Sequence, residues 1–140
     1  MAQGATSEAP AYCSELKRVA ALAATKERFA SIAGKPREGN FLDTSLALTG
    51  WRDCALYGSA TYTCDSGELN SAQEAEQAQA DILQEIKSCL GDRWVIAPER
   101  ASPSYVVLHD MMRPISITLS TDETADRKHI VHLIMFVRRN

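Results

Sequence analysis

The chain has 140 residues, of which 45% are hydrophobic and 24% charged, and its formal net charge at pH 7 is −3. This length predicts one domain that is large enough to bury a core without depending on disulfides. The slight acidic excess argues against nucleic-acid binding, which usually needs a basic surface. No apolar run reaches the ~18 residues of a membrane-spanning helix, so we expect no transmembrane segment.

The N-terminal residues predict a tail and then a helix. Residues 1–10 are small and polar, which is typical of a disordered tail, and a single α+β domain is expected over 11–140. The tail has the composition of a mature exported chain whose signal peptide has been removed. Residues 11–33 predict a helix from their three- and four-residue apolar steps, and Gly34-Lys35-Pro36 is expected to end it.

The next segment predicts strands. Residues 41–49 are expected to form a first strand with Leu46 and Leu48 among its apolar residues. Residues 52–57 and 60–65 predict a hairpin that turns at Gly58-Ser59. Folding the chain about this turn places Cys54 directly opposite Cys64.

Residues 71–90 carry the clearest helix pattern. Ser71 is a favourable N-cap, Glu74 completes a capping box, and Gly91 stands where a helix C-cap belongs. One apolar stripe runs along the segment, formed by Ala75, Ala78, Ile82, Ile86 and Cys89.

The last third of the chain is rich in β-strand patterns. A meander of three strands is expected at 104–109, 115–121 and 128–138, and 94–96 is a candidate for a further short strand. The final segment is apolar on both faces, which indicates a strand that is central in the sheet or covered by a partner. The predicted fold is therefore α+β, in the order α-β-β-β-α-β-β-β, with an antiparallel sheet of about five to six strands and two disulfide-linked helices on one face.

The four cysteines predict two structural disulfides. None of them forms a C-x-x-C pair, which argues against a zinc or thioredoxin-type site. Cys13 opens the first helix and Cys89 closes the second, so we expect the bonds Cys13–Cys89 and Cys54–Cys64. The alternative pairing joins Cys64 to Cys89 and Cys13 to Cys54. Disulfides indicate an oxidising compartment, so a periplasmic or secreted location is expected.

The histidines do not predict a metal site. His129 and His132 are an odd number of residues apart on one strand and therefore point to opposite faces. We expect no metal and no cofactor. If the protein is an enzyme, the sequence favours a small hydrolase with dispersed site residues around His109, Asp110 and His132, because His109-Asp110 lies at a strand end.

Two groups of residues are candidates for a binding surface. Trp51, Tyr57 and Tyr62 cluster around the predicted hairpin, and aromatic side chains beside a disulfide can form an interface. Met111 and Met112 are adjacent in a turn, so both cannot be buried, and exposed methionine suits an adaptable contact.

These patterns lead to three functional hypotheses. The first is an exported, non-enzymatic binding module for another protein or a cell-envelope component. The second is the small hydrolase described above. The third, compatible with either, is a homodimer formed through the last strand, 128–138, because that strand is apolar on both faces.

Overall fold

The computed structural model describes residues 9–98 and 101–138. Most of the predicted tail, 1–10, therefore lies outside the described residues. Within the described part, two α-helices, α2 (Cys13–Ala23) and α3 (Ala72–Leu90), accompany one eight-stranded antiparallel sheet. Its strands are β1 (Ala33–Pro36), β2 (Phe41–Thr44), β3 (Asp53–Tyr57), β4 (Thr61–Asp65), β5 (Trp94–Ile96), β6 (Tyr105–Asp110), β7 (Ile115–Glu123) and β8 (His129–Val137).

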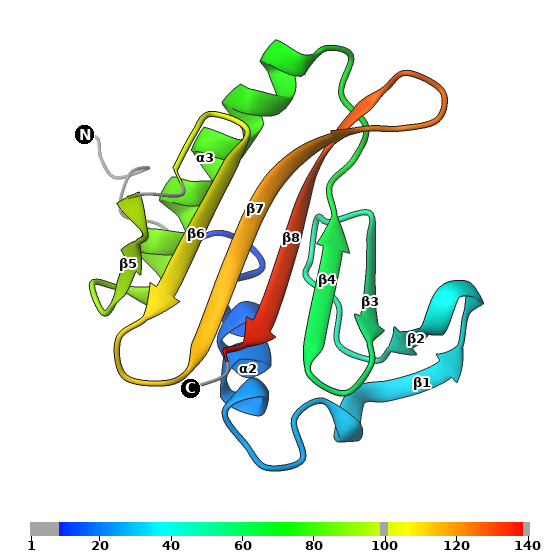
Figure 1. Ribbon diagram of the computed structural model, residues 1–140, viewed down its shortest axis with the longest axis vertical. Helices are drawn as coiled ribbons and strands as arrows, with labels where there is room; N and C mark the ends of the chain where they lie inside the picture. Colours follow the sequence, from blue (N-terminus) through cyan, green and yellow to red (C-terminus); the bar gives the residue numbers. More distant parts are fainter. Residues whose placement is uncertain (1–8, 99–100, 139–140) are drawn as a thin grey trace.

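The sheet consists of two four-stranded meanders joined at their last strands. Its spatial order is β1-β2-β3-β4-β8-β7-β6-β5, and each meander follows one of the two helices in the chain (Figure 1). β4 and β8 pair antiparallel at the centre of the sheet. The α+β class and the antiparallel sheet are confirmed. The sheet has eight strands, two more than the highest number expected from the sequence.

The strand β8 is apolar on both faces because it is central. It pairs with β4 along one edge and with β7 along the other, so neither edge is open to a second copy of the chain. The predicted homodimer through the last strand is therefore wrong: a strand whose backbone N–H and C=O groups are already paired on both sides cannot extend another sheet.

Both helices cover one face of the sheet. Figure 1 shows α3 behind β6 and β7, with α2 beyond the C-terminal end of α3 and behind β8. Apolar side chains of both helices and of strands β3 to β8 form one buried cluster between these two layers. The opposite face of the sheet, which we call the open face, is not covered by either helix.

The first helix ends ten residues earlier than expected. After Ala23, the Thr25 hydroxyl donates to the Leu22 carbonyl over 2.7 Å, and Arg28 adopts a left-handed φ of 56°, which an α-helix cannot contain. Phe29 and Ile32 are nevertheless buried, which explains why the apolar pattern continued past the helix end.

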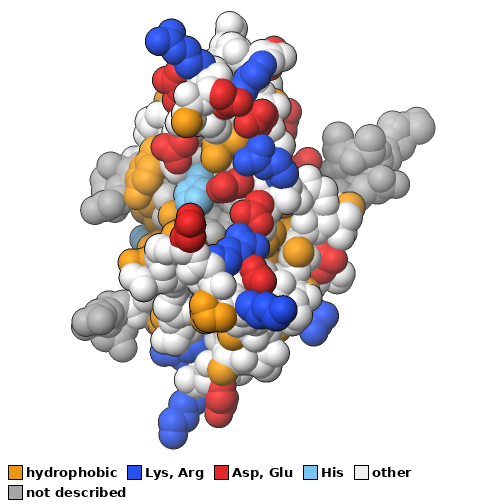
Figure 2. All heavy atoms as spheres, turned by 90° about the vertical axis from the view of Figure 1, so that its right-hand side faces the viewer, with side chains coloured by type: hydrophobic (Ala, Val, Ile, Leu, Met, Phe, Trp, Pro, Cys, Tyr) orange, Lys and Arg blue, Asp and Glu red, His pale blue; other side chains and the backbone are white. Residues whose placement is uncertain are grey.

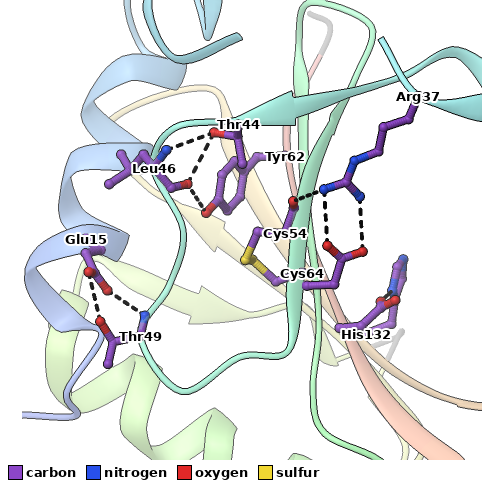
Figure 3. Close-up of a disulfide and its surroundings, with 11 residues drawn as sticks. Glu15, Arg37, Thr44, Leu46, Thr49, Cys54, Tyr62, Cys64 and His132 are labelled. Atoms are coloured by element: carbon purple, nitrogen blue, oxygen red, sulfur yellow. Dashed lines mark hydrogen bonds and ion pairs between the residues drawn. A yellow bond between two sulfur atoms is a disulfide. The ribbon is translucent and has the colours of Figure 1, made fainter. Parts of the chain in front are cut away.

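Strand β1 was missed, and the strand expected over 41–49 ends at Thr44. All four residues of β1 are exposed, so this edge strand has no apolar alternation to reveal it. Leu46 and Leu48 belong to a loop that packs into the core. Glu15 of α2 holds this loop by accepting hydrogen bonds from the Thr49 amide (2.6 Å) and hydroxyl (2.9 Å) (Figure 3).

Both predicted disulfides are confirmed. Cys13–Cys89 joins the start of α2 to the end of α3, with Cα atoms 5.6 Å apart. Cys54–Cys64 joins directly opposite residues of β3 and β4, with Cα atoms 4.1 Å apart. Only the first bond links the helices; the second joins two strands of the sheet.

The second helix has the predicted ends. The Ser71 side chain accepts a hydrogen bond from the Glu74 amide over 3.1 Å, and Gly91 ends the helix with a φ of 90°, a conformation that favours glycine. Neither of the described helices is long and apolar enough to cross a bilayer.

Candidate functional site

A row of polar side chains crosses the open face at right angles to the strands. Its members are consecutive cross-strand partners, so they all point to the same side of the sheet. From β3 to β6 they are Asp53, Asp65, His132, Ser120 and Tyr105. The first three place two carboxylates and one imidazole side by side on β3, β4 and β8.

This row forms part of a hollow with a volume of about 400 Å³. Asp53, Asp65 and His132 lie on the strands beneath it. Its wall comes from Arg37 and Glu38, which follow β1, and from Phe41 at the start of β2. We call this site the acidic hollow, because three of these six side chains are carboxylates. Figure 2 shows the corresponding side of the molecule, where acidic and basic side chains surround a histidine ring.

The wall is held in place by a tight turn. Gly39 and Asn40 have φ values of 72° and 69°, a left-handed pair that reverses the chain after β1. The Arg37 amide then donates to the Phe41 carbonyl over 2.6 Å, which closes the turn. The Phe41 ring packs on Tyr57 of β3, with ring centroids 5.1 Å apart.

Arg37 connects the wall to the sheet. Its Nη1 and Nη2 atoms donate to the two carboxylate oxygens of Asp53 over 3.1 and 3.2 Å, and its Nε donates to Asp43. Nη2 also donates to the Cys54 carbonyl over 3.3 Å, beside the disulfide (Figure 3). The hydrogen bonds to Asp43 and Asp53 raise the pKa of Arg37 above its ordinary value.

Asp65 and His132 form a hydrogen-bonded pair. The contact joins Asp65 Oδ1 to His132 Nδ1 across the β4–β8 pairing. This hydrogen bond raises the pKa of His132 above its ordinary value, burial opposes it, and the charges of Asp65 and Asp122 add to the increase. Among the described residues, Nε2 of His132 has no hydrogen-bond partner, so this atom is available to a ligand in the hollow.

The structure does not bring together the three residues of the predicted hydrolase site. His109 lies on the open face opposite Ser116, which in turn is opposite Phe136. Phe136 is four residues along β8 from His132, a distance of about 13 Å. Asp110 points to the helix-covered face, because successive residues of a strand alternate between faces.

Asp110 instead forms a buried ionic cluster. Its carboxylate is fully buried and accepts hydrogen bonds from the Arg93 side chain, the Arg113 side chain and the Met112 amide. Burial acts to raise the pKa of Asp110, but these hydrogen bonds outweigh it and lower the pKa to about 2. The cluster fixes the turn between β6 and β7 and leaves no carboxylate oxygen free for catalysis at the surface.

The aromatic residues proposed for binding have different surroundings. Trp51 is half-buried and packs edge-on against Tyr12, with ring centroids 5.9 Å apart. Tyr57 is 47% exposed on the open face. Tyr62 is fully buried on the helix-covered face, where its hydroxyl donates to the Leu46 carbonyl over 2.7 Å (Figure 3). Tyr62 therefore contributes to the core, and its ring is not available to a partner.

The sequence analysis missed Arg37, Glu38, Asp53 and Asp65. One signal was available: once Cys54 is placed opposite Cys64, Asp53 and Asp65 also become neighbours on the opposite face of the same hairpin. No comparable signal places Arg37 or His132 beside them, because those contacts depend on pairings between distant strands.

No group of three or more His, Cys, Asp or Glu side chains in the described part of the chain is arranged to hold a metal ion. The chain matches no family model, and no significant match was found among curated proteins or among solved structures.

Proposed function

We propose that the protein is an exported binding module whose acidic hollow accepts a basic side chain, lysine or arginine, of a protein partner. The observation that carries this proposal is the grouping of Glu38, Asp53 and Asp65 around one hollow of about 400 Å³ on the open face. A hollow of this size can accommodate a long side chain, and its carboxylates are chemically complementary to a cation.

The charge of the hollow supports a basic ligand. Three carboxylates line it, against the guanidinium of Arg37 and the imidazole of His132. Arg37 is already shared between Asp53 and Asp43, and His132 is already paired with Asp65. The lining therefore keeps a negative excess even when His132 is protonated.

Aromatic side chains beside the hollow add a second element of recognition. Phe41 is 36% exposed in its wall, and Tyr57 packs against Phe41. A guanidinium or ammonium group over such rings gains a cation–π contribution of about 0.5–1 kcal/mol at an exposed site. Acidic and aromatic groups together favour arginine or lysine over an apolar side chain.

The two disulfides support the exported location. Such bonds persist in the periplasm or outside the cell and are rare where thiols are kept reduced. Cys13–Cys89 joins the two helices, and Cys54–Cys64 joins the strands of the β3–β4 hairpin, which carries Asp53 and Asp65 of the hollow. A rigid site loses less entropy on binding than a mobile one.

Selection from a displayed peptide library on the oxidised protein tests the proposal. We expect the selected peptides to share a lysine or arginine, and replacement of that residue by uncharged citrulline or norleucine to weaken binding about tenfold or more, the scale of one charged hydrogen-bonded contact. Glu38→Gln is expected to weaken the binding of the same peptides. Glu38 forms no ion pair with any described residue, so the fold should remain intact.

The matched control is Glu76→Gln, which removes the same charge from an exposed position of α3 on the other side of the sheet. This variant should bind like the wild type. Selected peptides without a shared basic residue, or equal affinity of the basic and neutral peptides, would overturn the proposal.

A second candidate function is acid–base catalysis by His132. The specific observation in its favour is the Asp65–His132 hydrogen bond, which orients the ring of a residue that lines the hollow and leaves Nε2 without a hydrogen-bond partner among the described residues. A screen against ester, amide and phosphoester substrates with wild type and His132→Gln tests it. Turnover that disappears in a folded His132→Gln protein would support catalysis, and turnover that persists would exclude this centre.

A further inference from the structure

The turn between β6 and β7 presents two adjacent methionines at the surface. Met111 is 66% exposed and Met112 is 74% exposed, more than any other large apolar residue in the described part of the chain. The turn is held by specific contacts: the Met111 amide donates to the Arg93 carbonyl and the Met112 amide to Asp110 Oδ1, both over 2.8 Å. Its shape is therefore set by the fold, and it holds the methionines outward.

Basic side chains surround this turn. Arg93 and Arg113 both donate to Oδ2 of the buried Asp110, over 2.9 and 2.8 Å. One carboxylate balances only one of these two guanidinium groups. The side chains of Arg93 and Arg113 are 42% and 28% exposed, so the excess positive charge reaches solvent.

Two further cations lie in the same region. Lys17 of α2 lines a hollow of about 250 Å³ together with Arg93 and Arg113. Arg138, which follows β8, donates to the carbonyls of Asp110 (3.2 Å) and Arg113 (3.3 Å) at the base of the turn. Lys17, Arg93, Arg113 and Arg138 thus bring four basic groups to a region with the single buried carboxylate of Asp110, although the chain as a whole is acidic.

We propose that this turn, with its surrounding basic groups, docks the protein onto an anionic lipid bilayer. The two unbranched methionine side chains would enter the boundary between headgroups and acyl chains, while Lys17, Arg93 and Arg113 face the lipid phosphates. Apolar insertion and attraction to anionic headgroups are the two contributions that hold proteins at a membrane surface.

The size of the patch favours a bilayer over a protein partner. A stable protein interface covers about 800 Å² of each partner, which is far more than two methionine side chains can supply. A bilayer needs no shape-matched pocket, because lipids rearrange around an inserted tip. Electrostatic attraction of about 1 kcal/mol for each basic group near the surface compensates for the small apolar area.

Membrane docking would leave the acidic hollow accessible. The turn adjoins the pair Ile115–Val137, whereas the charged row crosses β7 and β8 at Ser120 and His132. These pairs are five residues apart along the strands, about 16 Å. The inference rests on different residues from the proposed function and can hold or fail independently of it.

Vesicle co-sedimentation of the oxidised protein tests the inference. We expect binding to phosphatidylcholine vesicles that contain about one-third phosphatidylglycerol, and little binding to phosphatidylcholine alone. Raising the salt to about 1 M, where the Debye length is about 3 Å, should release the protein. Met111→Ser/Met112→Ser and Lys17→Gln should each weaken binding, the double variant by about tenfold.

Two control variants replace an apolar and a basic side chain that lie away from the turn. Tyr105→Ser removes an exposed apolar group from the other end of β6, and Lys35→Gln removes a cation from the edge strand β1. Both should bind vesicles like the wild type, and the methionine and lysine variants should keep the wild-type melting temperature. Absence of wild-type binding to anionic vesicles would overturn the inference. Unchanged vesicle binding of Met111→Ser/Met112→Ser would also overturn it, because the protein would then bind the vesicles without using the turn.

Discussion

Asp65 on β4 and His132 on β8 lie directly opposite each other at the centre of the sheet and are hydrogen-bonded, although 67 residues separate them in the chain. The same strand pairing joins the two meanders into one sheet. The most distinctive polar contact of the open face therefore lies at the junction of the two halves of the fold.

Replacing Asp65 should lower the pKa of His132. In Asp65→Asn, the imidazolium loses its charged hydrogen-bond acceptor, and the remaining effect of burial disfavours the charged ring. Titration of the His132 ring signals by NMR measures the change. Asp43→Asn, which removes a carboxylate bound to Arg37 instead, is the control and should leave the pKa of His132 nearly unchanged.

The same pair predicts a pH dependence of stability. Because folding raises the pKa of His132, its contribution is fully present below the unfolded value of about 6.5 and is lost as the pH rises through the folded value. The difference in unfolding free energy between wild type and Asp65→Asn should therefore be larger near pH 6 than near pH 9. A constant difference across this range would contradict the pairing.

Asp110→Asn should destabilise the protein by about 2–3 kcal/mol at neutral pH, because a buried carboxylate loses charged hydrogen bonds to two arginines. The folded pKa of Asp110, about 2, lies below the ordinary value of 3.8, so its contribution is present above about pH 4 and is lost as the pH falls toward 2. Urea unfolding of wild type and variant at pH 7 and at pH 2.5 to 3 measures both effects. Asp92→Asn is the control and should change stability little at either pH.

Removal of the two disulfides should have unequal effects. Cys13–Cys89 closes a loop with a sequence separation of 76 residues, and Cys54–Cys64 one of 10. Loop-closure entropy predicts losses of about 4 and 2–3 kcal/mol, respectively, when each pair is replaced by alanine. Denaturant unfolding of the two double variants tests the order, and a larger loss for the short loop would contradict this account.

Tyr62→Phe should cost about 1 kcal/mol of stability without disturbing the open face. The change removes the buried hydrogen bond from the Tyr62 hydroxyl to the Leu46 carbonyl. Tyr57→Phe removes a hydroxyl from an exposed ring and should change stability by less than about 0.5 kcal/mol. Thermal unfolding compares the two variants, and equal effects would show that the buried hydrogen bond adds no stability.

Local patterns in the sequence were sufficient for several features of this protein. The capped helix at Ser71, the hairpin around Gly58-Ser59 and both disulfides were predicted, because each depends on residues near in sequence or on cysteines at the ends of predictable elements. The Cys54–Cys64 pair followed from hairpin symmetry alone.

The arrangement of the open face depended on contacts between distant segments. Nothing in residues 33–36 marks a strand, because an exposed edge strand has no apolar periodicity. The neighbour of β8 could not be read from its two apolar faces, which suit a central strand and a dimer interface equally. Cross-strand register brings Asp65 to His132 and a turn brings Arg37 to Asp53, and both arise only when the two meanders pair and pack as one sheet.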